Sequence, residues 1–443
     1  MRSDVPIDVS EAGFEGHILK SRGALKIAIL GVVDVGDDTR QSVRLAGADI
    51  IQNHFANDAI DGDVGADAER EGGNSDGGEG RGFAETSDGV EHLAGLTHDA
   101  VESWVLLAIL LLVLAISAAL IIAGTIYQAL ETMADRRRYP PPGRMIDIGG
   151  CRLHLIESGD GPPVIFEAGI SATCLNWTQV RGEVARFAAA CTYDRAWLGW
   201  SDPARSARTT STIVDELHAL LAGAGISPPY ILAGHSFGGM LVSAYAARYP
   251  DHMAGLVLVD PLSPSDWLNF SPAHARMLKL GVKLSRRGAA LARIGVVRVS
   301  LALLLAGGRR VPQWIAKLSS GRGESTISRL VGEVSKMPPE TWPAVRAHWC
   351  LAKSFQGMAA YLESLPASAR EAETLGEPAA IPITILSAAN ATPQQLSERD
   401  ALARRSPHGK HIIAAKSGHW IQLDEPELVV EAVRAMVEVI RPS

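Results

Sequence analysis

The chain has 443 residues, enough for one large domain with additional elements, and its formal net charge is −7. The acidic balance and a pI near 6 argue against nucleic-acid binding, and the chain has no basic, aromatic-studded groove or known motif for that function. The four cysteines lack metal-ligand spacing and are too few for a disulfide scaffold, which fits a reduced compartment: Cys151, Cys174, Cys191 and Cys350.

The first 100 residues differ in charge from the rest of the chain. They contain 20 Asp and Glu against 8 Lys and Arg, whereas the remainder has a small positive excess. Residues 24–52 are apolar enough for one or two strands, but residues 53–101 are rich in Gly, Asp and Glu and poor in large apolar side chains. Such a segment cannot bury enough surface to offset its conformational entropy. We therefore expect residues 1–101 to form an acidic, largely disordered leader.

A long apolar run follows the leader. No charged residue occurs from Ser103 to Leu130, which exceeds the ~20 residues that cross a bilayer core. Trp104 and Tyr127 flank the run, as interfacial aromatic residues do. A soluble helix of this length would normally show a polar face, and the run is too long and too far from the start for a cleaved signal peptide. The sequence predicts one transmembrane helix over residues 102–130.

The charges on either side of this run predict its orientation. The 20 residues before it contain no Lys or Arg, whereas four arginines follow it closely: Arg136, Arg137, Arg138 and Arg144. The positive-inside rule then places the C-terminal side in the cytoplasm. Residues 131–143 end near three consecutive prolines, so we expect a short, stiff, basic linker there.

From about Arg144 the pattern changes to short β-branched runs that alternate with amphipathic helical stretches. Eight candidate strands lie within residues 145–149, 151–157, 162–169, 189–195, 229–236, 254–261, 381–388 and 410–417. Several are continuous apolar runs, as in strands that are covered on both faces. Helical stretches occur near residues 176–188, 210–224, 237–248, 393–405 and 425–438. The pattern predicts an α/β fold with a mostly parallel eight-stranded sheet and helices on both faces.

A long segment without strong strand signals interrupts this pattern. Between Pro261 and about Leu375 the chain contains helical stretches instead. We therefore expect the core to comprise residues 144–261 and 376–443, with residues 262–375 inserted as a helical cap.

The strongest chemical motif is PYILAGHSFGG at residues 229–239. An apolar strand ends in Gly234-His235-Ser236-Phe237-Gly238 and a helical stretch follows, so G-x-S-x-G occurs in its strand–turn–helix context. The turn is too tight for side chains at the flanking glycines, and its strain holds the serine hydroxyl at the sheet edge. The following helix directs its N-terminal N–H groups to the same point. Ser236 is the candidate nucleophile, with a glycine-rich packing turn as the alternative.

On these residues the chain resembles the α/β-hydrolase superfamily from about Arg144 to the C-terminus. The stretch YDRAWLGWSDP at residues 193–203 is similar to the family's segment after the fourth strand, although Trp197 stands where the family usually has glycine. The resemblance implies a serine hydrolase, here a membrane-anchored member with a helical cap. It disfavours a dehalogenase or an epoxide hydrolase, because those families have an aspartate where Ser236 stands.

A serine hydroxyl is a poor nucleophile unless a neighbouring base takes its proton. His419 follows the last predicted strand in a segment that resembles the family's histidine loop, and it follows Ser236 in the expected chain order. The acid is open between two positions. Asp260 closes the sixth strand, where some family members carry the acid, whereas the usual position after the seventh strand offers no carboxylate before Glu398 and Asp400. We expect Asp260 to be the acid, with a capping role at the strand end as the alternative.

The resemblance also implies two backbone donors for an oxyanion. One is the N–H of Phe237, directly after the nucleophile. By alignment with the family, the other is the N–H of Ile170 in the sequence Glu167-Ala168-Gly169-Ile170, where the family more often has His-Gly. A backbone donor does not depend on its side chain, so the missing histidine is compatible with activity.

The predicted cap is strongly basic. Residues 267–323 contain 11 Lys and Arg and no Asp or Glu, and apolar runs lie between the charges. Beside a transmembrane anchor, such a surface suits anionic lipid headgroups. The alternative is that the apolar residues form the cap's own core and the charges only solvate it.

These features favour a membrane-tethered serine hydrolase that cleaves a small-molecule or lipid-like ester through an acyl-enzyme. An amidase or aminopeptidase-like hydrolase would use the same chemistry, and a non-catalytic binding protein can retain the scaffold. No motif for a metal, nucleotide or flavin cofactor occurs in the sequence. We expect membrane lipids as partners and no nucleic acid, and the sequence names no protein partner.

Overall fold

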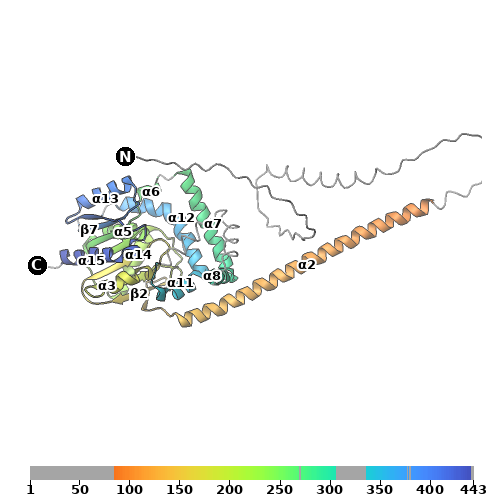
Figure 1. Ribbon diagram of the computed structural model, residues 1–443, viewed down its shortest axis with the longest axis horizontal. Helices are drawn as coiled ribbons and strands as arrows, with labels where there is room; N and C mark the ends of the chain where they lie inside the picture. Colours follow the sequence, from red (N-terminus) through yellow and green to blue (C-terminus); the bar gives the residue numbers. More distant parts are fainter. Residues whose placement is uncertain (1–83, 269–270, 306–335, 377, 379–380, 441–443) are drawn as a thin grey trace, which may run out of the picture. The chain divides into compact units, whose positions relative to one another are not determined.

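A computed structural model describes residues 84–268, 271–305, 336–376, 378 and 381–440 (Figure 1). The chain divides into two units, Met1–Ala94 and Gly95–Ser443. The second unit contains the sheet and every candidate site residue. The strands predicted within residues 24–52 lie outside the described residues.

An eight-stranded sheet forms the centre of the second unit. Its strands are β1 (Arg144–Asp147), β2 (Arg152–Ser158), β3 (Pro163–Glu167), β4 (Ala189–Asp194), β5 (Tyr230–His235), β6 (Met253–Val259), β7 (Ile383–Ala388) and β8 (Lys410–Ala414). They lie in the order β1-β2-β4-β3-β5-β6-β7-β8. β2 pairs antiparallel with β1 and β4, and the other neighbours are parallel. The predicted mostly parallel, eight-stranded α/β fold is confirmed.

Helices cover both faces of the sheet because successive side chains of a buried strand point to opposite faces. On β5, Ile231 and Ala233 belong to the apolar cluster of α3 (Thr178–Val184) and α15 (Pro426–Ile440). Leu232 belongs to the opposite cluster, with α4 (Thr210–Ala224), α5 (Phe237–Arg248) and α13 (Pro393–Arg405). Three short helical elements complete the connections: η1 (Cys174–Trp177), η2 (Pro250–His252) and α14 (Ile421–Asp424).

The segment between β6 and β7 is helical and contains no strand where the structure describes it. Its elements are α6 (Ser265–Leu268), α7 (Pro272–Arg293), α8 (Val296–Leu305), η3 (Pro339–Thr341), α11 (Trp342–Trp349) and α12 (Ala352–Leu375). α7 and α12 run side by side (Figure 1). They pack closely, since a Cβ at Gly288 would lie only 2.5 Å from the ring of Phe355.

One long helix, α2 (Ala84–Arg138), precedes the sheet. Among the described residues, Val101–Arg138 is the single helical stretch that is long and apolar enough to cross a membrane, and its most apolar window is fully exposed. The predicted disorder up to residue 101 and the predicted linker from residue 131 are wrong where α2 extends over them. Residues 84–101 contain no proline, and a helix that has nucleated adds residues at little cost. The helix ends at Arg138, before the three prolines, which cannot continue it.

The C-terminal part of α2 packs against the start of α8. The Arg298 guanidinium donates hydrogen bonds to the Asp135 carboxylate at 2.6 Å and to the Gln128 amide oxygen at 3.0 Å. All three side chains are buried. Nearby, a Cβ at Gly124 would collide with the carbonyl oxygen of Ile294. These contacts join α2 to the helical segment between β6 and β7.

Candidate active site

Ser236 occupies the turn between β5 and α5. Its backbone has φ 55° and ψ −119°, a conformation that residues with side chains rarely adopt. A Cβ at Gly234 would lie 2.5 Å from the carbonyl oxygen of Gly238, and a Cβ at Gly238 would lie 2.5 Å from that of Glu167. The glycines of the motif are therefore required by close backbone packing. The turn holds Ser236 at the carboxyl end of the sheet, where open α/β sheets bind their ligands.

His419 and Asp260 meet at the same edge of the sheet. His419 lies in the loop after β8, and Asp260 directly follows β6. The Nδ1 of His419 lies 2.6 Å from Oδ2 of Asp260. Since a carboxylate only accepts, this contact assigns the hydrogen to Nδ1 and leaves Nε2 free to take a proton. The His419 side chain is 47% exposed, so a substrate has access to the ring.

Asp260 is held as a carboxylate. Burial alone would raise its pKa, but the hydrogen bond from His419 and the positive charge of Arg399 lower the pKa to about 2. The other carboxylate oxygen, Oδ1, accepts hydrogen bonds from Arg399 Nη1 at 2.7 Å and from the Ala388 N–H at 3.2 Å. The two oxygens of Asp260 thus have different partners, and only Oδ2 faces His419.

Arg399, in α13, is a site residue that the sequence analysis did not identify. Its side chain is buried and also donates a hydrogen bond of 2.8 Å to Ser387 Oγ. Ser387 Oγ in turn lies 2.7 Å from Nε2 of His411. This chain of contacts fixes the guanidinium between α13 and the ends of β6 and β7. No local sequence signal marks Arg399, because its partner lies 139 positions earlier in the chain.

The other two candidate acids have different partners. Asp400 Oδ1 lies 2.5 Å from Nδ1 of His411, and its side chain is 49% exposed. Glu398 accepts hydrogen bonds from the Ser263 hydroxyl at 3.1 Å and from the Gln394 amide at 3.0 Å. Asp260 is therefore the acid that the fold brings to His419.

His235 supports the loop that carries His419. Its Nε2–H donates a hydrogen bond of 2.8 Å to the His419 carbonyl oxygen, and the two ring centroids are 4.7 Å apart. Burial, followed by the neighbouring His419, lowers the pKa of His235 to about 3. His235 therefore acts as a neutral donor next to Ser236. Within the described residues the Ser236 hydroxyl makes no hydrogen bond, so its contact with His419 stays a prediction; such contacts often tighten only when substrate binds.

The loop after β3 reaches the turn that carries Ser236. A Cβ added to Gly169 would lie 3.8 Å from Cβ of Ser236. The buried Arg195 holds this loop: it forms an ion pair with Glu167 and donates to the carbonyl oxygens of Ala168 and Gly169. Sequence reasoning missed Arg195 as well, although it lies directly after β4.

The two candidate oxyanion donors remain available for a ligand. In the part of the chain that the structure describes, the N–H groups of Phe237 and Ile170 donate to no other protein group. Phe237 opens α5, so its N–H lies at the positive end of that helix. Ile170 lies in the loop that Arg195 holds in place.

Trp197 adopts a conformation that suits the glycine found at this position in the family. Its φ is 74°, in the left-handed region. The indole N–H donates to the Ala204 carbonyl oxygen at 3.1 Å, and a Cβ at Gly357 of α12 would lie 2.5 Å from Cβ of Trp197. Trp197 therefore packs between the sheet and α12.

A second group of chemically reactive side chains lies on β2, η1 and β4. His154, Cys174 and Asp194 are buried, and their ligand atoms lie within 4.8 Å of one another. Asp194 already accepts hydrogen bonds from His154 Nδ1 and from the Cys174 N–H, each at 2.8 Å. Burial raises the pKa of the Cys174 thiol well above its usual range, so the thiol stays neutral. These features indicate an internal hydrogen-bond network that joins the three elements. They do not favour a metal site.

Comparison with known proteins identifies relatives over parts of the chain. It is 33% identical over 116 residues to uncharacterized protein YqjL of Bacillus subtilis (strain 168), a match that covers 26% of this chain and 46% of YqjL. It is 28% identical over 134 residues to the cis-3-alkyl-4-alkyloxetan-2-one decarboxylase of Shewanella oneidensis, covering 30% of this chain and 41% of that enzyme. The chain thus spans less than half the length of these two relatives.

Solved structures share the fold. A mutant of a provisionally assigned epoxide hydrolase from Pseudomonas aeruginosa matches with a TM-score of 0.51 at 16% identity, over 67% of this chain and 97% of that one. The family model described as alpha/beta hydrolase fold matches residues 162–426, more than half of the chain. With the strand order and the Ser236 turn, this match shows that the chain belongs to the α/β-hydrolase fold family.

Proposed function

We propose that the chain is a serine hydrolase that cleaves carboxylic esters through an acyl-enzyme. One observation carries the proposal: the strained turn presents Ser236 at the sheet edge where His419 and Asp260 are hydrogen-bonded at 2.6 Å. This is the nucleophile, base and acid set that nucleophilic catalysis by serine requires. A serine at this position favours acyl transfer over the aspartate chemistry of dehalogenases and epoxide hydrolases.

The proposed reaction has two half-reactions. Ser236 Oγ attacks the carbonyl carbon while its proton passes to His419 Nε2, and the N–H groups of Phe237 and Ile170 stabilise the oxyanion. The bond to the leaving group then breaks, and the alcohol departs with the proton from His419. Water attacks the acyl-enzyme with the same base, which releases the carboxylic acid and restores the Ser236 hydroxyl. Asp260 stabilises the imidazolium in both halves.

We also propose that α2 tethers the hydrolase domain to a membrane on its cytoplasmic side. The exposed apolar stretch within Val101–Arg138 and the three arginines that end α2 support this orientation. A tethered hydrolase meets esters with acyl chains at the bilayer surface, so lipid-like esters are the favoured substrates. A reporter fused after Ser443 should be active only in the cytoplasm, and activity on the opposite side would overturn the orientation.

The proposed chemistry is tested with a serine-directed fluorophosphonate probe. Wild-type protein should be labelled, and Ser236→Ala should abolish labelling without loss of the folded state. Labelling that survives in Ser236→Ala would remove the proposed nucleophile. Hydrolysis of a p-nitrophenyl ester and its matched anilide separates ester from amide preference. A folded wild type that is neither labelled nor active would favour the non-catalytic alternative.

A further inference from the structure

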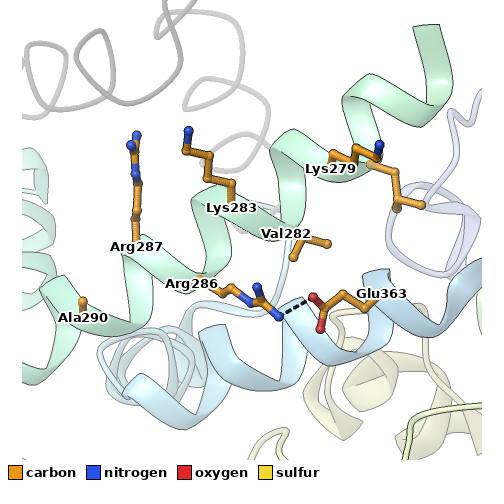
Figure 2. Close-up of a pocket in the computed structure, with 8 residues that line it drawn as sticks. Lys279, Val282, Lys283, Arg286, Arg287, Ala290 and Glu363 are labelled. Atoms are coloured by element: carbon orange, nitrogen blue, oxygen red, sulfur yellow. Dashed lines mark hydrogen bonds and ion pairs between the residues drawn. The ribbon is translucent and has the colours of Figure 1, made fainter. Parts of the chain in front are cut away.

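The two faces of α7 differ sharply in chemistry. The inner face packs on α12: Ala289 and Ala292 are buried, and a Cβ at Gly281 would lie 3.2 Å from Leu362. The outer face carries Lys279, Lys283 and Arg287, which follow one another at intervals of four residues and therefore share one side of the helix. Figure 2 shows Lys283 and Arg287 extending to the same side, away from α12.

The cations of this face lack acidic partners on their own helix. α7 contains six Lys and Arg and no Asp or Glu. Arg286 turns toward α12 and pairs with Glu363 at 2.5 Å (Figure 2). The outer three are like charges at helical contact spacing, an arrangement that destabilises a helix on its own. A negatively charged surface that lies against this face would offset the repulsion between the three cations.

Apolar surface lies beside these charges. An open groove of about 580 Å³ runs along α7. It is lined by Lys279, Lys283 and Arg287, by the paired Arg286 and Glu363, and by the aliphatic residues Leu278, Val282 and Ala290. It includes no residue of the proposed catalytic set. Further exposed aliphatic side chains follow the same elements: Met277 is 66% and Leu280 43% exposed on α7, and Val299 is 46% exposed on α8. Cationic side chains next to exposed aliphatic side chains are typical of helices that lie at a bilayer surface.

The contacts of α2 place α7 at the end of the apolar run. Gly295, between α7 and α8, would meet the Gly124 carbonyl oxygen at 2.9 Å if it carried a Cβ. Arg298 of α8 binds Asp135 of α2 at 2.6 Å. Asp135 lies five residues after Leu130, the last residue of the uncharged run. The end of a transmembrane apolar run lies at the headgroup level of a bilayer. The C-terminal end of α7 is therefore held close to that level.

We propose that the outer face of α7, formed by Lys279, Lys283 and Arg287, docks on anionic phospholipid headgroups of the membrane that α2 crosses. The inference rests on the proposed tether. The three cations bind the phosphates, and Leu280 enters the boundary between headgroups and acyl chains. We infer a bilayer as the binding partner of this face, because the proposed tether holds the cations of α7 close to the membrane surface.

The test uses the full chain with Leu280→Cys, labelled with an environment-sensitive fluorophore, in nanodiscs of phosphatidylcholine alone or with 30% phosphatidylglycerol. Cys174, Cys191 and Cys350 are buried, and wild-type protein carried through the same labelling gives the background from the partly exposed Cys151. Emission should rise in the anionic discs and fall again in 0.5 M salt, where the screening length is only about 4 Å. Equal emission in both lipids would overturn the proposal.

The charge dependence is tested with Lys279→Glu, Lys283→Glu and Arg287→Glu combined. Each cation near an anionic surface contributes about fivefold to binding, so losing three should lower the docked-to-undocked ratio by about 100-fold. The matched control, with the same change in net charge at exposed positions elsewhere, should dock normally: Arg205→Glu, Arg404→Glu and Lys410→Glu. Equal losses in both variants would overturn a specific role for α7.

Two further outcomes are distinguishable. High emission in both kinds of disc that 0.5 M salt does not change would show that another part of the chain covers position 280, which contradicts docking on lipid. A chain that does not co-purify with either disc would refute the tether before emission is read. Ester hydrolysis in detergent reports folding of the charge variants and stays independent of docking.

Discussion

Replacing Asp260 with asparagine should remove the proposed acid function through a specific change in hydrogen bonding. Oδ1 of Asp260 accepts from Arg399 at 2.7 Å and from the Ala388 N–H at 3.2 Å, and both partners can only donate. The asparagine oxygen must therefore take the Oδ1 position. Its NH₂ group then faces Nδ1 of His419, where a carboxylate oxygen accepts at 2.6 Å in the wild type.

The consequence is the wrong histidine tautomer. When Nδ1 of His419 accepts from the introduced amide, the ring hydrogen lies on Nε2, which can no longer take the Ser236 proton. An Asp-to-Asn change in a Ser-His-Asp triad lowers turnover by about 10⁴-fold, equivalent to about 5.5 kcal/mol of transition-state stabilisation. We expect Asp260→Asn to lose activity on this scale with little change in KM.

Asp400→Asn is the matched control. Its carboxylate contacts His411 and is 49% exposed, so its removal should change kcat by no more than about twofold. The assay is hydrolysis of a p-nitrophenyl ester, with thermal melting of both variants as the check on folding. A folded Asp260→Asn protein that retains turnover within about tenfold of wild type would falsify the reasoning, as would an equal loss in Asp400→Asn.

Other substitutions test the remaining parts of the site and the fold. His419→Ala should lower p-nitrophenyl ester turnover as far as Ser236→Ala does, and the double variant should lose no more than either alone, because triad members act as a unit; additive losses would contradict this. Arg399→Met removes a charge-assisted hydrogen bond to the acid and should lower kcat by about 10- to 100-fold, with partial recovery in Arg399→Lys; unchanged kcat would refute its positioning role. Burial lowers the pKa of His235 to about 3 and that of His348 to about 4, below the value of about 6.5 in the unfolded chain. The unfolded state therefore binds more protons as the pH falls from 6.5 to 4, and stability should fall by up to about 2.7 kcal/mol per pH unit, a slope that His348→Phe should halve in melts at stepped pH. A pH-independent melting temperature over that range would contradict the buried neutral histidines.

The parts of the site that could be predicted from the sequence are those that depend on local sequence patterns. Ser236 lies in a turn whose strand, glycines and helix are contiguous, and the structure shows close backbone contacts at both glycines. Asp260 could be paired with His419 because parallel strands end at one edge and β5 and β6 are neighbours. These inferences need only strand order and the direction of the chain.

Arg399 and Arg195 could not be predicted in this way. Arg399 lies in a helix that was predicted with its observed bounds, residues 393–405, but helical periodicity does not say which buried partner an arginine finds. Along the chain, the helical segment between β6 and β7 separates Arg399 from its partner Asp260. Arg195 follows β4, and its role depends on the carbonyl groups of the loop after β3. Both residues act through tertiary contacts that leave no mark at the level of composition or spacing.

The C-terminal end of α2, the proposed anchor, also could not be predicted from the sequence. The sequence indicates an apolar helix followed by a short, stiff, basic linker, and it predicts no contact between that helix and the hydrolase domain. In the structure α2 continues to Arg138, and the buried pair of Asp135 with Arg298 at 2.6 Å joins it to α8. Removing one partner of a buried ion pair costs about 3–5 kcal/mol, because the other charge is left uncompensated. The helix α2 is therefore a structural part of the hydrolase domain, and if α2 crosses a bilayer as proposed, its position would fix which face of the helices between β6 and β7 meets the lipid.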